Sequence, residues 1–187
     1  MIVDINPQNF HAELIDASMK KPVVIYFHAP QMPECQGMTP LVETLVGPAN
    51  PVLARAIAAA QRRGAVIVAP VGNDGPAAPA AYPASYPEVI AVTGVDGRNR
   101  AMIEAGRALH LDYAGPGADM LAANAAGRWV KVRGTSFAVP FVASRAALAL
   151  GGPVAARLDR EAIDLGKRGP DEIYGRGLLC VICRRTR

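Results

Sequence analysis

The chain has 187 residues, of which 51% are hydrophobic and only 5% aromatic, so its core is expected to be mostly aliphatic. The net charge is +4, and arginines cluster only at the carboxyl terminus, which argues against a nucleic-acid-binding surface. The longest apolar run, residues 137–150, is interrupted by Pro140 and Arg145 and is too short to span a bilayer. Neither a nucleic acid nor a membrane is therefore expected as a partner.

The amino terminus and the cysteines bear on the cellular compartment. The first residues, M-I-V-D-I, lack the basic and apolar regions of a secretory signal, so a cytoplasmic location is the default expectation. The three cysteines are Cys35, Cys180 and Cys183, and an odd number argues against a disulfide framework.

Strands and helices are predicted to alternate over the first 46 residues. Residues 2–5 predict a short strand, and a helix begins after Pro7. Residues 23–27, V-V-I-Y-F, are a continuous run of apolar β-formers and predict a buried strand. A second helix is expected over about residues 35–45. Short links between these elements predict a βαβ unit with a right-handed crossover.

Residues 1–45 resemble the opening of a thioredoxin domain. The matching pieces are V-D-I-N, K-P-V-V-I-Y-F and C-Q-G-M-T-P-L-V-E. Thioredoxins carry W-C-x-x-C before the second helix, whereas this chain has Met32 at the first cysteine position and keeps only Cys35. A dithiol couple needs both sulfurs, so thioredoxin-type redox catalysis is not expected. A thiol-reactive protein that uses Cys35 alone remains an alternative.

The composition changes at Gly47, after which a helix, a strand and a glycine-rich loop are predicted. The helix covers residues 51–63 and is ended by Gly64. The strand is the apolar run 65–71, and the loop G-N-D-G follows it. A glycine-rich turn after a buried strand is where α/β sheets place their chemistry, which makes this loop a candidate location for a site. An asparagine in such a loop is otherwise an ordinary turn residue.

A second buried strand is predicted at residues 89–95, and residues 133–144, R-G-T-S-F-A-V-P-F-V-A-S, predict a tight turn and a helix. This helix is apolar on nearly every side, which is typical of a buried helix, so Phe141 and its neighbours are expected in the core. Ser136 would lie at the helix amino terminus, where free N–H groups and the helix dipole favour developing negative charge. Ser136 is therefore either a reactive group or only a helix N-cap.

The stretch G-T-S-F-A-V-P-F-V-A-S resembles the nucleophile segment of the subtilisin-like serine proteases, the subtilases, with Ser144 where the family mostly has glycine. Four other segments agree with the family in order: G-A-V-I-V-A-P-V-G-N-D-G, Y-P-A-S-Y-P-E-V-I-A-V-T-G-V-D, L-D-Y-A-G-P-G and Y-G-R-G-L. The resemblance covers about residues 47–179. It implies that Ser136 is the nucleophile and that Asn73 supplies the side-chain donor of the oxyanion hole.

A subtilase triad also needs an aspartate in a D-T-G-type segment and a histidine in an H-G-T-type segment, both upstream of Gly47. Neither string occurs in this sequence. Of the three histidines, His11, His28 and His110, none is expected to act as the base, and His28 is the best candidate if one does. A serine hydroxyl is a weak nucleophile without an adjacent base, so the chain on its own is expected to be inactive or nearly so.

Together these patterns predict an α/β fold, a parallel sheet with helices on both faces, divided into a thioredoxin-like fragment (1–46) and a subtilase-like half (47–187). The expected function is that of a subtilisin-like serine endopeptidase with an incomplete triad, acting on peptide or protein substrates if active. The alternative is a non-catalytic, thioredoxin-like binding or scaffold module. No cofactor or metal is expected, because the C-x-x-C of Cys180 and Cys183 has no second ligand pair nearby. The oligomeric state is left open.

Overall fold

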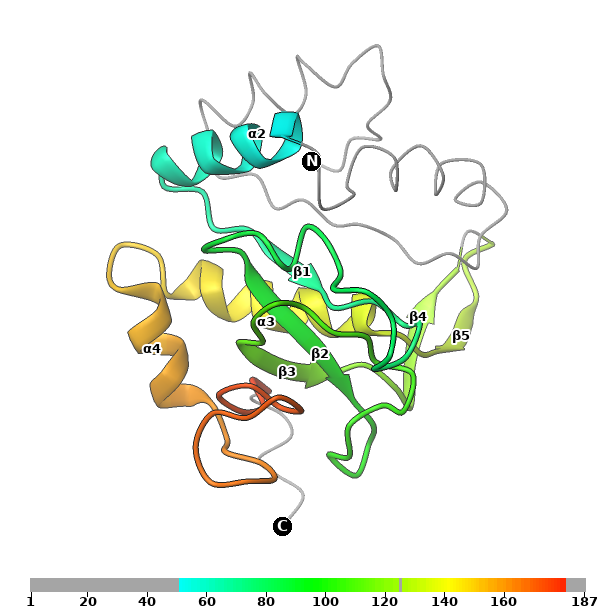
Figure 1. The fold of residues 1–187 in the computed structure, drawn as a ribbon. Coiled ribbons are helices and arrows are strands. Elements are labelled where there is room, and N and C mark those ends of the chain that lie inside the picture. Colours follow the sequence, from blue (N-terminus) through cyan, green and yellow to red (C-terminus); the bar gives the residue numbers. More distant parts are fainter. Residues whose placement is uncertain (1–50, 125, 181–187) are drawn as a thin grey trace.

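The computed structural model describes residues 51–124 and 126–180 (Figure 1). The segment 1–46, for which a thioredoxin-like fragment is predicted, lies outside the described residues, as do His11 and His28. The described elements, in chain order, are α2 (Pro51–Arg62), β1 (Val68–Pro70), β2 (Ile90–Val95), β3 (Tyr113–Pro116), β4 (Met120–Ala123), β5 (Trp129–Val132), α3 (Thr135–Leu148) and α4 (Val154–Glu161).

The central sheet is parallel, as the sequence predicts. Its strand order is β1-β2-β3, with Val68 opposite Ile90 and Val92 opposite Tyr113. The predicted helix 51–63 and strand 89–95 are confirmed to within one residue at each end. The strand predicted over residues 65–71 is only three residues long, because the chain joins the ladder at Val68 and leaves it at Pro70.

Helices cover both faces of this sheet because successive side chains of a strand point to opposite sides. Val68 and Val92 belong to a buried cluster with residues of α3 and α4, whereas Ala69 and Ala91 belong to another with Ile57 of α2. The two clusters place α2 and α3 on opposite faces. The predicted layering of helices on both sides of a parallel sheet is therefore confirmed.

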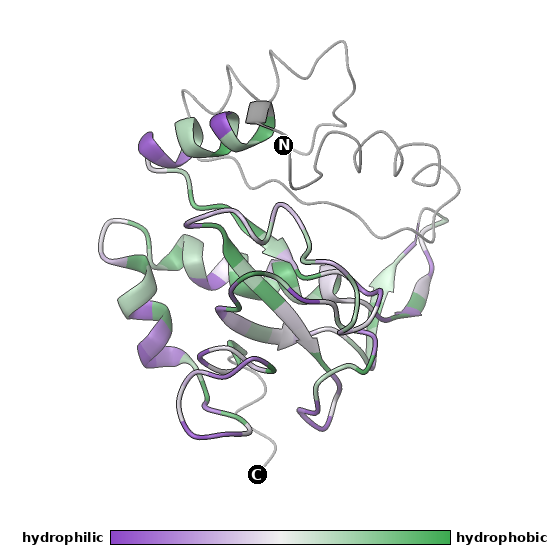
Figure 2. Ribbon diagram, viewed as in Figure 1, coloured by the Kyte–Doolittle hydropathy of each residue, from purple (hydrophilic) through white to green (hydrophobic). Residues whose placement is uncertain are grey.

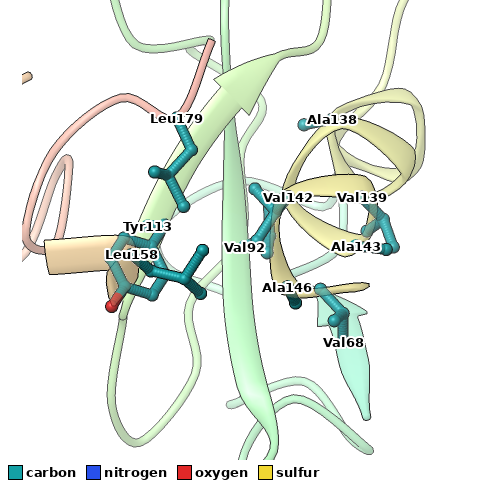
Figure 3. Close-up of a cluster of buried hydrophobic side chains, with 10 residues drawn as sticks. All are labelled: Val68, Val92, Tyr113, Ala138, Val139, Val142, Ala143, Ala146, Leu158 and Leu179. Atoms are coloured by element: carbon teal, nitrogen blue, oxygen red, sulfur yellow. The ribbon is translucent and has the colours of Figure 1, made fainter. Parts of the chain in front are cut away.

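Figure 3 shows the cluster in which α3 packs against the sheet, with Val92 of β2 between the α3 side chains and Leu158 of α4. The buried residues of α3 are spaced three and four apart, as expected for one face of a helix: Thr135, Ser136, Ala138, Val139, Val142, Ala143 and Ala146. Each fully buried Leu or Val contributes roughly 1.5–3 kcal/mol relative to an exposed one. This face holds the start of α3 firmly against the sheet.

The expectation that α3 is buried all round is wrong. Pro140, Ser144, Ala147 and Leu148 are exposed, and Phe141 is only half-buried. Apolar composition alone does not place every face of a helix in the core, since an apolar residue can also lie at the surface. The helix therefore has one buried and one solvent-facing side.

Sequence analysis missed two elements. One is α4, whose Leu158 is fully buried in the α3 cluster. The other is the antiparallel hairpin of β4 and β5, in which Met120 lies opposite Val132 and which leads directly into α3 (Figure 1). The hairpin is mostly exposed, including Trp129 at 72%. Figure 2 shows hydrophobic residues along the first part of β2 and in α3, and hydrophilic residues in several loops and at the end of α4. None of the helices that the structure describes has the length and apolar character needed to cross a membrane.

Candidate active site

Ser136 is the second residue of α3 and lies at the end of the hairpin connection. Its side chain is largely buried, with the residue only 6% exposed. The N-cap position is Gly134, which has φ 152° and makes no side-chain cap hydrogen bond. The interpretation of Ser136 as the N-cap is therefore wrong, because the helix begins at Thr135, two residues earlier than that interpretation requires. Ser136 instead lies within the first turn, among backbone N–H groups that have no intrahelical acceptor.

Asn73 lies in the loop that leaves the carboxyl end of β1. Gly72 and Gly75, on either side of it, have φ of 84° and 85°, a backbone conformation that glycine adopts without strain. The loop is fastened on one side by two backbone hydrogen bonds: Gly106 N–H donates to Gly72 O (2.8 Å), and Gly75 N–H donates to Glu104 O (2.9 Å). The asparagine is therefore held on a short, well-anchored turn.

Thr135 connects the Asn73 loop to the residue beside Ser136. Its backbone N–H donates to Asn73 Oδ1 at 2.8 Å, and its hydroxyl donates to Gly72 O at 3.1 Å. Thr135 is fully buried, so both hydrogen bonds are shielded from water. With Oδ1 occupied by this N–H, the two N–H donors of the Asn73 amide are directed elsewhere. An added Cβ at Gly134 would lie 3.6 Å from Asn73 Nδ2, which places the amide next to the turn before Ser136.

Three glycines allow the backbones to meet at this corner. An added Cβ at Gly117 would lie 2.9 Å from Gly94 Cα and 3.1 Å from Gly134 O. Gly134 N–H in turn donates to Gly117 O at 2.8 Å, so the turn before Ser136 is hydrogen-bonded to the segment after β3. The carboxyl ends of β1, β2 and β3 therefore converge on the start of α3, the edge at which parallel sheets build their sites.

The arrangement brings together the parts needed to stabilise an oxyanion next to a hydroxyl. Ser136 supplies the hydroxyl and Asn73 supplies amide N–H donors. The first turn of α3 supplies the backbone N–H of Ser136 and the positive end of the helix dipole, since the N–H of Thr135 is bound to Asn73 Oδ1 and that of Phe137 to Gly134 O. The sequence prediction that Ser136 and Asn73 share one site is consistent with this geometry. The groups here are acceptors and donors for an acyl-transfer reaction, with no acid–base residue among those just named.

His110 is placed at the opposite end of β2. Its Nε2 lies 2.9 Å from Val89 O and 3.6 Å from Asp112 Oδ2, at the residue preceding the strand. Thr135, beside Ser136, lies against Gly94 near the other end. Gly94 lies five positions beyond Val89, about 16 Å at about 3.3 Å per residue. His110 is therefore out of reach of Ser136, in agreement with the expectation that it is not the base.

Cys180 is largely buried and disulfide-bonded. The odd number of cysteines argued against a disulfide framework, but parity only requires that one cysteine stay unpaired, so it does not exclude one bond. A disulfide sulfur is not a thiolate, so Cys180 is unavailable as a zinc ligand. Within the described residues, no group of three or more His, Cys, Asp or Glu side chains could hold a metal ion.

One ion pair next to the site was missed by the sequence analysis. Arg133, the residue before Gly134, donates from Nε to Glu104 Oε1 and from Nη2 to Glu104 Oε2, the second at 2.8 Å. The Arg133 hydrogen bond lowers the pKa of Glu104, and the same bond raises the pKa of Arg133. Glu104 and Arg133 are 29 positions apart, so no local spacing could reveal the pair.

Comparison with known proteins agrees with the geometry. A model of the subtilase family matches residues 35–162. Subtilisin DY of Bacillus licheniformis is 34% identical over 157 residues, covering 78% of this chain and 56% of that protein. The thermophilic serine proteinase of Bacillus sp. (strain AK1) is 38% identical over 96 residues, covering 51% of this chain and 24% of that protein.

Two solved structures share the fold. The prenylagaramide maturation protease PagA superposes with a TM-score of 0.62 at 27% identity, covering 74% of this chain and 55% of that one. Sphericase gives a TM-score of 0.61 at 22% identity, covering 68% and 52%. The chain thus spans about half the length, or less, of the proteins it matches.

The family match begins at residue 35, inside the segment 1–46 that was expected to be thioredoxin-like, and continues through both predicted site residues. It covers well over half of the 187 residues. With the parallel sheet, the buried start of α3 and the Asn73 loop all in the family's order, this match shows that the chain belongs to the subtilase family.

Proposed function

We propose that residues 47–187 are the nucleophile-bearing half of a subtilisin-like serine endopeptidase. Ser136 is the nucleophile and Asn73 donates to the oxyanion. The observation that carries this assignment is the hydrogen bond from Thr135 N–H to Asn73 Oδ1, which fixes the Asn73 amide beside the turn that presents Ser136. The substrate class is a peptide or protein, because the relatives that match the chain are named subtilisins and proteases.

In this mechanism Ser136 Oγ attacks the carbonyl carbon of the scissile peptide. The carbonyl oxygen becomes an oxyanion, which accepts hydrogen bonds from Asn73 Nδ2 and from the backbone N–H of Ser136. One oxyanion donor of this kind is worth roughly 10²–10³ in turnover. The Asn73 amide is held by the Thr135 hydrogen bond before the substrate arrives, so little reorganisation accompanies the charge.

The missing element is the base that takes the Ser136 proton. The sequence holds no D-T-G or H-G-T segment, and His110 lies at the other end of β2. We therefore propose that this chain alone is inactive or nearly so, and that a full peptidase needs an aspartate and a histidine from another segment. The thioredoxin-like start at 1–46 is part of the same proposal. It would make the chain a fusion of a thioredoxin-like fragment with a subtilase-like half.

The test is ester and peptide hydrolysis by the wild type, Ser136→Ala and His28→Ala, combined with a fluorophosphonate probe. Rates near background in all three chains are expected. A rate that falls at least about 10²-fold in both variants would mean that the chain has a working nucleophile–base pair, and the inactivity proposal would fail. His110→Ala is the matched control and should leave any rate unchanged.

A separate outcome concerns the nucleophile assignment. The probe is expected to modify Ser136 slowly in the wild type and not at all in Ser136→Ala. If a polypeptide carrying D-T-G and H-G-T segments is added and neither labelling nor hydrolysis increases, the non-catalytic binding module becomes the better explanation.

A further inference from the structure

The Arg133–Glu104 pair joins two segments that both contact the candidate site. Arg133 directly precedes the Gly134 turn that presents Ser136. The Glu104 backbone carbonyl accepts a hydrogen bond from Gly75, two residues beyond Asn73, while its carboxylate binds Arg133. One residue of the loop after β2 therefore contacts both the oxyanion loop and the nucleophile turn.

We infer that Glu104 and Arg133 are positioning residues, which set the distance between the Asn73 amide and Ser136. The inference rests on the proposed function, because these are the two groups whose separation matters. It adds a second connection to the direct one made by Thr135. Without the ion pair, the Asn73 loop and the Ser136 turn are joined mainly by the two Thr135 hydrogen bonds.

The geometry of the pair suits this role. A two-point contact between guanidinium and carboxylate fixes orientation as well as distance, which a lysine could not do. The side chains are 51% and 31% exposed, so the pair adds little to overall stability. Its value lies in position, because a displacement of about 1 Å at a catalytic site can cost on the order of 10²-fold in rate.

Arg133 is also faced by other carboxylates. Asp119 and Asp96 both raise the pKa of Arg133, after the larger effect of Glu104. Asp119 Oδ2 accepts the N–H of Gly97 at 3.0 Å, and neither aspartate is hydrogen-bonded to the Asn73 loop. Asp119 therefore provides a control that alters the charge around Arg133 and leaves the connection to Gly75 in place.

The experiment is amide hydrogen exchange by NMR on the full chain, with Thr135 N–H as the reporter, since that proton bonds to Asn73 Oδ1. Leu179 N–H, which donates to Ala114 O on the far side of β3, is the remote reference. In Glu104→Gln, exchange at Thr135 should accelerate about threefold to fivefold, the factor for an exposed ion pair, with Leu179 unchanged. Asp119→Asn should change neither amide.

The charge-exchanged double variant Glu104→Arg with Arg133→Glu should bring Thr135 exchange back to within about twofold of the wild type, because it restores the pair in reverse. Equal acceleration at Thr135 and Leu179, or no acceleration at either, would overturn the positioning role. These readouts do not depend on hydrolysis. Failure of the peptidase proposal would show in the probe assay, and failure of this inference would show in the exchange rates.

Discussion

The two ends of β2 carry similar chemistry for different purposes. At the carboxyl end, Ser136 and Asn73 meet in a corner built from three strand ends and the first turn of α3. At the amino end, His110 and Asp112 lie beside each other, with His110 Nε2 3.6 Å from Asp112 Oδ2. A serine protease needs a hydroxyl, an imidazole and a carboxylate. This part of the chain holds all three types of group, but the hydroxyl lies at one end of β2 and the imidazole and carboxylate lie at the other.

The environment explains why the His110–Asp112 pair is structural. Asp112 Oδ2 accepts the N–H of Ala91 at 2.9 Å. Asp112 lies just before β3 begins, so no backbone carbonyl of β3 is available for this N–H. The Asp112 carboxylate therefore takes the place of a missing ladder partner. At the other end of the strand, glycines leave room for backbone groups to converge and for donors to stay free. Position relative to the strand ends, rather than residue type, separates scaffold from site.

The largest effect is expected from crowding the carboxyl end of the sheet, where Ser136 and Asn73 lie. An added Cβ at Gly106 would lie 2.2 Å from Val71 O, so Gly106→Ala must displace the strand that carries the Asn73 loop. We expect a loss of about 1–3 kcal/mol in the free energy of unfolding, measured by urea denaturation. Gly97→Ala is the control, because its added Cβ would meet only Asp119 at 3.4 Å. Equal stability of the two variants would contradict the crowding argument.

Removing the Asp112 carboxylate, which lies beside His110 at the amino end of β2, should have a smaller effect, confined to the free energy of unfolding. Asp112→Ala leaves the buried N–H of Ala91 without its acceptor, at a cost of about 1 kcal/mol because Asp112 is partly exposed. Thr135 amide exchange, measured relative to the global unfolding free energy, should be unaffected. A selective acceleration of amide exchange at Thr135 would show that the two ends of β2 are energetically coupled. It would contradict the separation of scaffold and site between the two ends.

A further effect depends on pH and lies in the loop after β2. Partial desolvation raises the pKa of Asp96, but hydrogen bonds from the Arg100 side chain and from the Arg100 and Arg98 backbones outweigh it and lower the pKa to about 2. A lowered carboxylate pKa stabilises the fold above its unfolded value of 3.8, and this stabilisation is lost as pH falls from 3.8 toward 2.

The check is urea denaturation of wild type and Asp96→Asn at several pH values. The difference in unfolding free energy between them should be constant near neutral pH and shrink below pH 3.8. A difference that stays the same down to pH 2 would mean that the Asp96 hydrogen bonds do not favour its ionised form.

Local sequence determined much of this protein. The apolar runs and their glycine boundaries were enough to predict α2, β2 and a parallel sheet with helices on both faces, because burial of a strand on both sides requires continuous apolar residues. The segments around Asn73 and Ser136 predicted one shared site through their resemblance to the subtilase family. Taken alone, each segment indicated only a glycine-rich loop after a buried strand and the start of an apolar helix.

Only the tertiary structure decided the rest. The half-exposed position of Phe141 depends on which side of α3 meets the sheet, and an apolar helix does not specify that by itself. The Glu104–Arg133 pair joins positions 29 residues apart, and the location of His110 depends on the direction of β2. In each case the deciding contact is between segments distant in sequence, and the free energy of such contacts appears only when the sheet has brought them together.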